Sequence, residues 1–183
     1  MQTINAVYSE GRIIVPAQNE ADSLYQDGYG IRTTYGSITL EPCEALYLVE
    51  KERIIVIIEK DRRVISFQQL LDNELERDVT IWIRYIVYRN IRGRGFVTKS
   101  SNSNGASFLV YERGSYLKKP PNYEVYTVYE GMLETIGHLE EILRKVENSG
   151  RFLKLAVVDR RGEVIYYGLD RLDLNALGSN VAE

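Results

Sequence analysis

The feature that most constrains the fold is a change of hydrophobic period in the second half of the chain. Residues 78–95 place Ile81, Tyr85, Tyr88 and Ile91 on one side of a helix, which two glycines then end. Strand-like runs follow, written "GFVTK", "SFLVYE" and "NYEVYTVY". Helices and strands thus come in separate blocks, which predicts an α+β fold.

A second amphipathic helix is expected over residues 133–150, with Gly150 at its end. Its predicted buried stripe consists of Leu133, Ile136, Leu139, Leu143 and Val146. Two more strand-like runs, "FLKLAVVD" and "EVIYYGLDRL", close the chain around the turn "RRG". The last run is apolar on both faces, which is typical of a central strand or of one that continues across a subunit interface.

The first half reads as a smaller α+β unit. "AVYSEGRIIVP" predicts two strands that turn at Gly11, and "GYGIRTTYGSITL" adds further β-type sequence. A helix capped by Thr39 is expected across "LEPCEALYLVEKE", followed by a strand in "RIIVIIE" and a helix capped by Ser66. We therefore expect two domains, residues 1–75 and residues 76–183.

Composition excludes several functional classes. The chain of 183 residues has one cysteine, Cys43, and one histidine, His138, too few for an internal disulfide or a common zinc site. No metal or other cofactor is expected. The net charge of −3 argues against nucleic-acid binding by bulk charge alone. No apolar run approaches the roughly 20 residues of a membrane span, and the N-terminus lacks a signal-peptide pattern, so a cytoplasmic protein is expected.

Three stretches occur in an order and spacing that match one family: "YIVYRNIRGRGFVTK", "GASFLVYERG" and "LKLAVVDRRGEVIYY". They resemble the C-terminal, restriction-nuclease-like α/β domain of archaeal tRNA-splicing endonucleases. "EPCEALYLVEKERIIV" is similar to the N-terminal domain of the same family. The resemblance implies metal-independent RNA cleavage that leaves a 2′,3′-cyclic phosphate and a 5′-hydroxyl.

The family performs this cleavage with a tyrosine as general base, a histidine as general acid and a lysine that stabilises the phosphorane charge. By resemblance the tyrosine position is Tyr111, the histidine position is Tyr123 and the lysine position is Arg151, while Lys154 lies a few residues away. A phenol with a pKa near ~10 is a poor proton shuttle at neutral pH. Arginine keeps the charge of lysine but not its geometry.

A further departure precedes the "GASF" motif, where the family commonly has a basic and an aromatic residue. This chain has Ser103 and Asn104 there. The resemblance therefore implies a non-catalytic, structural subunit that pairs with a homologous catalytic subunit. Two such pairs would form a heterotetramer that cuts precursor tRNA at bulge-containing splice sites.

The main alternative is a self-sufficient, metal-independent RNA endonuclease that uses Tyr111 with Arg151 or Lys154. A metal-dependent nuclease is a weaker rival, since Asp159 and Glu163 flank a turn but no lysine follows the glutamate. A stand-alone RNA-binding module is disfavoured by the acidic charge balance. Without an acid partner, Tyr111 is also readily explained as a packed tyrosine.

Several charged residues have both a functional and an ordinary interpretation. Arg144 stands where the family often has an RNA-contacting arginine, but it also suits the C-terminal end of a helix. Glu130 and Glu134 match an acidic loop that docks into a basic groove of the opposite subunit in the family. Glu134 also suits a helix N-terminus. His138 is expected on the solvated flank of its helix rather than in an active site.

Overall fold

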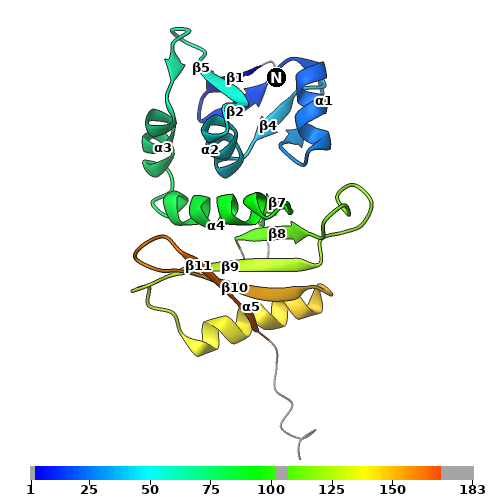
Figure 1. Ribbon diagram of the computed structural model, residues 1–183, viewed down its shortest axis with the longest axis vertical. Helices are drawn as coiled ribbons and strands as arrows, with labels where there is room; N and C mark the ends of the chain where they lie inside the picture. Colours follow the sequence, from blue (N-terminus) through cyan, green and yellow to red (C-terminus); the bar gives the residue numbers. More distant parts are fainter. Residues whose placement is uncertain (1–2, 102–106, 170–183) are drawn as a thin grey trace, which may run out of the picture.

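The computed structural model describes residues 3–101 and 107–169 (Figure 1). The N-terminal part contains, in chain order, β1 (Ile4–Ser9), β2 (Arg12–Val15), α1 (Gln18–Gln26), β3 (Ile31–Arg32), β4 (Ile38–Leu40), α2 (Pro42–Glu50), β5 (Ile54–Ile58), β6 (Val64–Ile65) and α3 (Phe67–Leu75). The C-terminal part contains α4 (Ile81–Gly93), β7 (Val97–Ser100), β8 (Phe108–Tyr111), β9 (Tyr123–Tyr129), α5 (Ile136–Asn148), β10 (Phe152–Val158) and β11 (Val164–Leu169). The α+β class is confirmed. Across the described residues no helix has both the length and the apolar character that a membrane span requires.

The first sheet has six strands in the order β3-β4-β2-β1-β5-β6, with β1 and β5 parallel and the other pairs antiparallel. The expected turn at Gly11 is present, with a positive φ of 73° that favours glycine. Helix α1 was not predicted, because its sequence "QNEADSLYQ" buries only Ala21 and Leu24 and so carries little periodic signal.

The predicted cap of α2 is wrong. Thr39 lies inside β4, and Glu41 is the N-cap. Glu41 and Glu44 form a reciprocal capping box, in which each side chain accepts a hydrogen bond from the other residue's backbone N–H. The predicted cap of α3 is confirmed, since Ser66 accepts from the backbone N–H of Gln69 at 3.2 Å.

Helix α4 lies between the two sheets (Figure 1). Its predicted stripe of Ile81, Tyr85, Tyr88 and Ile91 is buried, as the 3.6-residue period requires. This stripe belongs to one continuous cluster of buried side chains that includes residues of both sheets and of α2. The helix therefore provides core for both halves of the chain.

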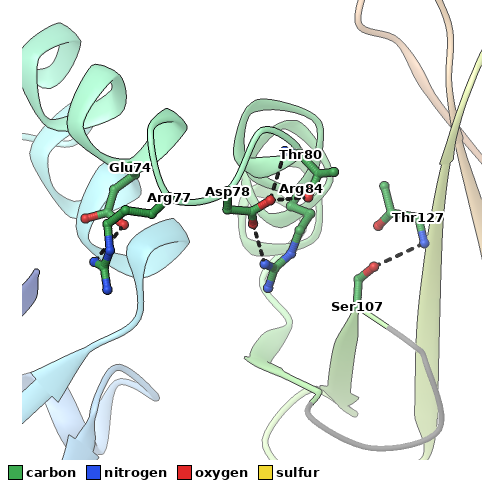
Figure 2. A network of polar contacts seen from close by, with 7 residues as sticks. All are labelled: Glu74, Arg77, Asp78, Thr80, Arg84, Ser107 and Thr127. Carbon is green, nitrogen blue, oxygen red and sulfur yellow. Dashed lines mark hydrogen bonds and ion pairs between the residues drawn. The ribbon is translucent and has the colours of Figure 1, made fainter.

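A polar network fixes the start of α4 (Figure 2). Asp78 accepts hydrogen bonds from the backbone N–H of Thr80 at 2.9 Å and from Arg84 Nη1 at 2.9 Å. Burial alone would raise the pKa of the Asp78 carboxyl, but the bonds from Thr80 and Arg84 together lower it below its usual value. The ionised carboxylate thus accepts a hydrogen bond from the Thr80 N–H group, which has no partner within the first turn of the helix.

The second sheet has five strands in the order β11-β10-β9-β8-β7. One face packs on α4 through Phe108, Val110, Val125 and Ala156. The other face packs on α5 through Tyr126 and Leu153, which form a separate buried cluster with side chains of that helix. Successive residues of a strand point to opposite faces, so the register decides which side chains share a site.

Two details of this half differ from the predictions. Helix α5 starts at Ile136, and Leu133 and Ile136 are exposed, whereas Ile142, Leu143 and Val146 form the buried face. The stripe was extended one turn too far because apolar residues of the preceding loop continue the period. The central-strand interpretation of 163–172 is also wrong for the part that the structure describes, because β11 is an edge strand. Residues 170–172 lie outside the described residues.

Candidate functional site

Tyr111 lies at the end of β8 and lines a hollow of about 370 Å³ between the two halves of the chain. The N-terminal half contributes Tyr25 and Arg32, and the loop after β8 contributes Tyr116. Lys99 of β7 also lines the hollow. The predicted tyrosine position is therefore in a recess, where a working side chain is commonly held.

Three tyrosine rings form one side of this hollow. The ring of Tyr116 meets that of Tyr111 edge-on at 5.2 Å between centroids, and Tyr25 meets Tyr116 at 6.3 Å. Burial, followed by the electrostatic interaction with Tyr25, raises the pKa of Tyr111 above its usual value, while the positive charge of Arg151 opposes this shift. Burial also raises the pKa of Tyr116 to about 12. A phenol with a raised pKa is a weaker source of phenolate at neutral pH.

Arg151 is on the same face of the second sheet as Tyr111. Leu109 of β8, Glu124 of β9 and Leu153 of β10 lie opposite one another in the register. Tyr111 is two positions along β8 from this row and so shares its face. Arg151 precedes β10 by one residue, and its contact with Glu124 places its side chain on the same face. The predicted tyrosine and lysine positions therefore project from the same side.

The guanidinium of Arg151 is already paired with a buried carboxylate. Its Nε and Nη2 atoms lie 2.7 and 2.6 Å from Glu124 Oε1. The Glu124 side chain is fully buried, and that of Arg151 is 22% exposed. Hydrogen bonds between ionised groups are stronger than those between neutral groups, particularly when they are shielded from water. The only positive charge of the predicted trio is thus neutralised from within the chain.

Tyr123 lies on the opposite face of the sheet from Tyr111. It pairs with Val110 in β8 and with Phe152 in β10, and Val110 packs into the core beside α4. Lys154 is on this opposite face too, with its Nζ 5.8 Å from the centroid of the Tyr123 ring. The register therefore brings Tyr111 together with Arg151 but not with Tyr123 or Lys154. Ser103 and Asn104 lie outside the described residues.

Glu134 forms a cluster within its own chain at the start of α5. It accepts hydrogen bonds from the hydroxyl of Tyr126 and, at 3.0 Å, from the backbone N–H of Thr135. His138 Nδ1 is 2.7 Å from Glu134 Oε1. The Tyr126 bond, followed by those from His138 and Thr135, outweighs burial and lowers the pKa of the Glu134 carboxyl. Glu134 therefore joins α5 to β9.

The other charged candidates are accessible. Glu130 is about half exposed and pairs with Arg160, whose Nε is 3.1 Å from Glu130 Oε1. Arg144 is exposed on α5, beside Glu140 and Glu141. Both remain open to contacts with another molecule, in contrast to Glu134.

The residues of the metal-nuclease alternative shape a turn. Asp159 Oδ1 accepts hydrogen bonds from the backbone N–H groups of Arg161 and Glu163, both at 2.8 Å. These bonds lower the pKa of the Asp159 carboxyl, with the Glu163 bond contributing most. Within residues 3–101 and 107–169 no group of three histidine, cysteine or carboxylate side chains is arranged to hold a metal ion.

Sequence reasoning missed several residues of the site, among them Tyr25, Tyr116 and Glu124. Tyr25 belongs to the helix that was not predicted, and Tyr116 lies in a turn. Glu124 carried one available signal, since a carboxylate inside the apolar run "YEVYTV" calls for a buried partner. The identity of that partner depends on the register and could not be read from the sequence.

Comparison with known proteins gives matches along both halves. Residues 4–71 match the family described as tRNA intron endonuclease, N-terminal domain, and residues 81–166 match tRNA intron endonuclease, catalytic C-terminal domain. The tRNA-splicing endonuclease of Methanococcus vannielii is 30% identical over 173 residues, which cover 94% of this chain and 97% of the relative. Those of Thermococcus onnurineus and Pyrococcus furiosus are each 26% identical, covering 88% and 93% of this chain and 92% and 98% of the relatives.

Proposed function

Because the chain belongs to the tRNA intron endonuclease family, we propose that it acts in precursor-tRNA splicing as a non-catalytic subunit. A homologous catalytic subunit supplies the complete set of tyrosine, histidine and lysine. Two subunits of each kind form the heterotetramer, which works in the cytoplasm on bulge-containing splice sites. This chain completes the scaffold and contacts the RNA, with Arg144 as one candidate contact.

The observation that carries this proposal is the ion pair between Arg151 and Glu124. In-line cleavage at phosphorus develops negative charge on the phosphorane, which a free, correctly placed cation must stabilise. Arg151 is paired with Glu124 instead, and its release would break an ion pair with a fully buried carboxylate. Tyr123, at the general-acid position, is directed to the other side of the sheet. Tyr111 thus lacks both partners that the reaction requires.

We predict that the purified chain does not cleave a bulge-containing precursor tRNA, and that addition of the catalytic homologue restores cleavage. Tyr111→Phe in this chain should leave the rate of the mixed enzyme within about twofold, because the partner carries the chemistry. The measurement is gel analysis of 2′,3′-cyclic-phosphate products under single-turnover conditions. Tyr116→Phe, which alters the neighbouring ring of the same hollow, is the matched control.

Two outcomes would contradict the proposal. Cyclic-phosphate product from the pure chain would favour the self-sufficient alternative with Tyr111 and Arg151. A loss of about 10²-fold or more in the mixed enzyme carrying Tyr111→Phe, the usual effect of removing a catalytic acid or base, would show that this tyrosine participates.

The proposed assembly uses the edge strand β11 and the loop after β9. Ile165 and Tyr167 are 53% and 50% exposed at the edge of the second sheet, on the face that carries α5. An apolar sheet edge offers both backbone groups and contact area to a homologous strand. The docking role of the acidic loop is assigned to Glu130, since Glu134 is engaged within the chain.

We predict that Ile165→Lys prevents stable pairing with the catalytic subunit at micromolar concentration, because a charge would be buried at the contact without a partner. Light scattering on the co-purified subunits measures the mass. The matched control is Val64→Lys, which places the same charge on an equally exposed edge strand of the first sheet.

Glu130→Lys tests the loop separately. We expect it to convert tetramers into dimers, because the new lysine would face the basic groove of the opposite subunit. The effect should weaken at high salt, since salt screens the repulsion between these positive charges. A tetramer of unchanged mass and activity in Ile165→Lys would exclude the edge strand from the interface. A tetramer of unchanged mass and activity in Glu130→Lys would exclude a docking role for Glu130. Its only role would then be the contact with Arg160 in the native chain.

A further inference from the structure

A second hollow, of about 470 Å³, lies on the α4 face of the second sheet, opposite the face that carries Tyr111. Its floor is apolar and is formed by Ile91 of α4, Val110 of β8 and Val125 of β9. None of its lining residues lines the hollow of Tyr111. Its size and apolar floor are typical of sites for small organic ligands.

The walls of this hollow are aromatic rings, each with a cation above it. Arg94 Cζ lies 5.2 Å from the centroid of Tyr166. Arg113 Cζ lies 4.8 Å from that of Phe96, and Lys154 Nζ lies 5.8 Å from that of Tyr123. Such cation–π contacts hold the three positive groups against the walls.

These three cations form no ion pair with any carboxylate in the described parts of the chain. Arg113 instead donates from Nε and Nη2 to the backbone carbonyl of Arg94, at 3.1 and 2.7 Å, which fixes its guanidinium at the rim. Among the other described residues, most arginines form an ion pair with a carboxylate, as Arg53 does with Asp27, although four arginines do not: Arg12, Arg62, Arg92 and Arg144. Three positive groups that form no ion pair within the described residues are thus gathered around one hollow.

One carboxylate is also present at this hollow. Glu112 lines it and accepts a hydrogen bond from Asn122 Nδ2 at 2.7 Å through Oε1. A carboxylate repels a phosphate but accepts hydrogen bonds from ring N–H groups and exocyclic amines. The hollow therefore offers an apolar and aromatic surface for a flat ring, an acceptor for the edge of that ring, and cations for an anionic group.

We propose that this hollow binds a nucleoside phosphate unit, with the base against the aromatic walls and the phosphate on Arg94, Arg113 and Lys154. Base stacking on aromatic side chains combined with cations for the backbone is the general way in which proteins hold unpaired nucleotides. The same chemistry is present in a free mononucleotide and in an unpaired nucleotide of an RNA strand. A plain acidic peptide would use the cations but not the aromatic walls.

The test is calorimetric titration of the intact chain with each of the four nucleoside 5′-monophosphates, with inorganic phosphate, and with a short unstructured oligoribonucleotide. We expect Arg113→Ala and Lys154→Ala each to weaken nucleotide binding about tenfold, the loss of one charge-assisted contact. Lys60→Ala removes an exposed lysine of the β5–β6 turn and is the matched control. Circular dichroism verifies that each variant is folded.

The two nucleotide sources are distinguished by which probe binds. Saturable binding of monophosphates identifies a free-nucleotide site, whereas binding of the oligoribonucleotide alone, weakened by the same variants, identifies an RNA contact. The proposal is overturned if inorganic phosphate binds as tightly as the nucleotides, if no nucleotide probe binds at millimolar concentration, or if Lys60→Ala weakens binding equally. Binding is read without cleavage or a partner subunit, so a negative result leaves the proposed splicing function untouched.

Discussion

Replacement of Lys99 by methionine is expected to lower the free energy of unfolding by about 3–5 kcal/mol. Lys99 Nζ lies 2.8 Å from Glu44 Oε1 and 2.8 Å from the carbonyl of Gly30, and the Glu44 side chain is only 1% exposed. Removal of the lysine leaves a buried carboxylate without its countercharge, which costs far more than the net value of the intact pair. Urea denaturation of the pure chain measures the change.

Two further variants sharpen this test. In the double variant Glu44→Gln with Lys99→Met, the amide oxygen can still accept from the backbone N–H groups of Gly30 and Glu41, so most of the lost stability should return. Lys145→Met breaks the exposed pair with Glu141 and should cost far less than Lys99→Met, because water and salt screen an exposed pair. Equal costs for Lys99→Met and Lys145→Met would contradict the importance of the buried pair.

Replacement of Arg151 by methionine should likewise cost about 3–5 kcal/mol, because it breaks the ion pair with the fully buried Glu124 carboxylate. The free energy of unfolding of Arg151→Lys should lie between those of Arg151→Met and the native protein. An ammonium group keeps the positive charge but cannot bind Glu124 through two nitrogen atoms. Thermal or urea unfolding of the pure chain provides the measurement. Arg144→Ala, an exposed change on the adjoining helix, should stay within about 0.5 kcal/mol.

This experiment also separates the two roles considered for Arg151. A catalytic arginine would lose activity on substitution while the stability of the chain stayed nearly unchanged. A structural arginine loses stability first, and the mixed enzyme should lose activity only where the variant subunit unfolds. A stable but inactive Arg151→Met subunit would therefore refute the structural role.

Local signals in the sequence were sufficient for most elements. The α4 stripe, the Ser66 cap, the Gly11 turn and most strands of the two sheets follow from spacing within a few residues, whereas the two-residue strand β6 was not predicted. The failures are also local: α1 buries too little to be periodic, and Thr39 was preferred as a cap over Glu41, whose capping box depends on Glu44. Leu133 fits the apolar period of α5, but it precedes the helix and is exposed.

The site was harder to predict because it depends on pairing between strands. The resemblance located Tyr111 and Arg151, which do share a face, but a one-residue difference in β9 decides that Glu124 and not Tyr123 joins them. No spacing within β9 reveals this, since the register is set by its contacts with β8 and β10. Introduction of histidine at position 123 would therefore place the imidazole on the wrong side of the sheet to restore a general acid.

The position of α4 has a further consequence for how the chain comes apart. Because one helix supplies buried surface to both sheets, neither half has a complete interior without it. A chain cut in the short connection between α3 and α4 would give two fragments, each with an open apolar surface that matches the other. We therefore expect such fragments to reassociate when mixed, and we expect the two halves of the intact chain to unfold together in one cooperative transition.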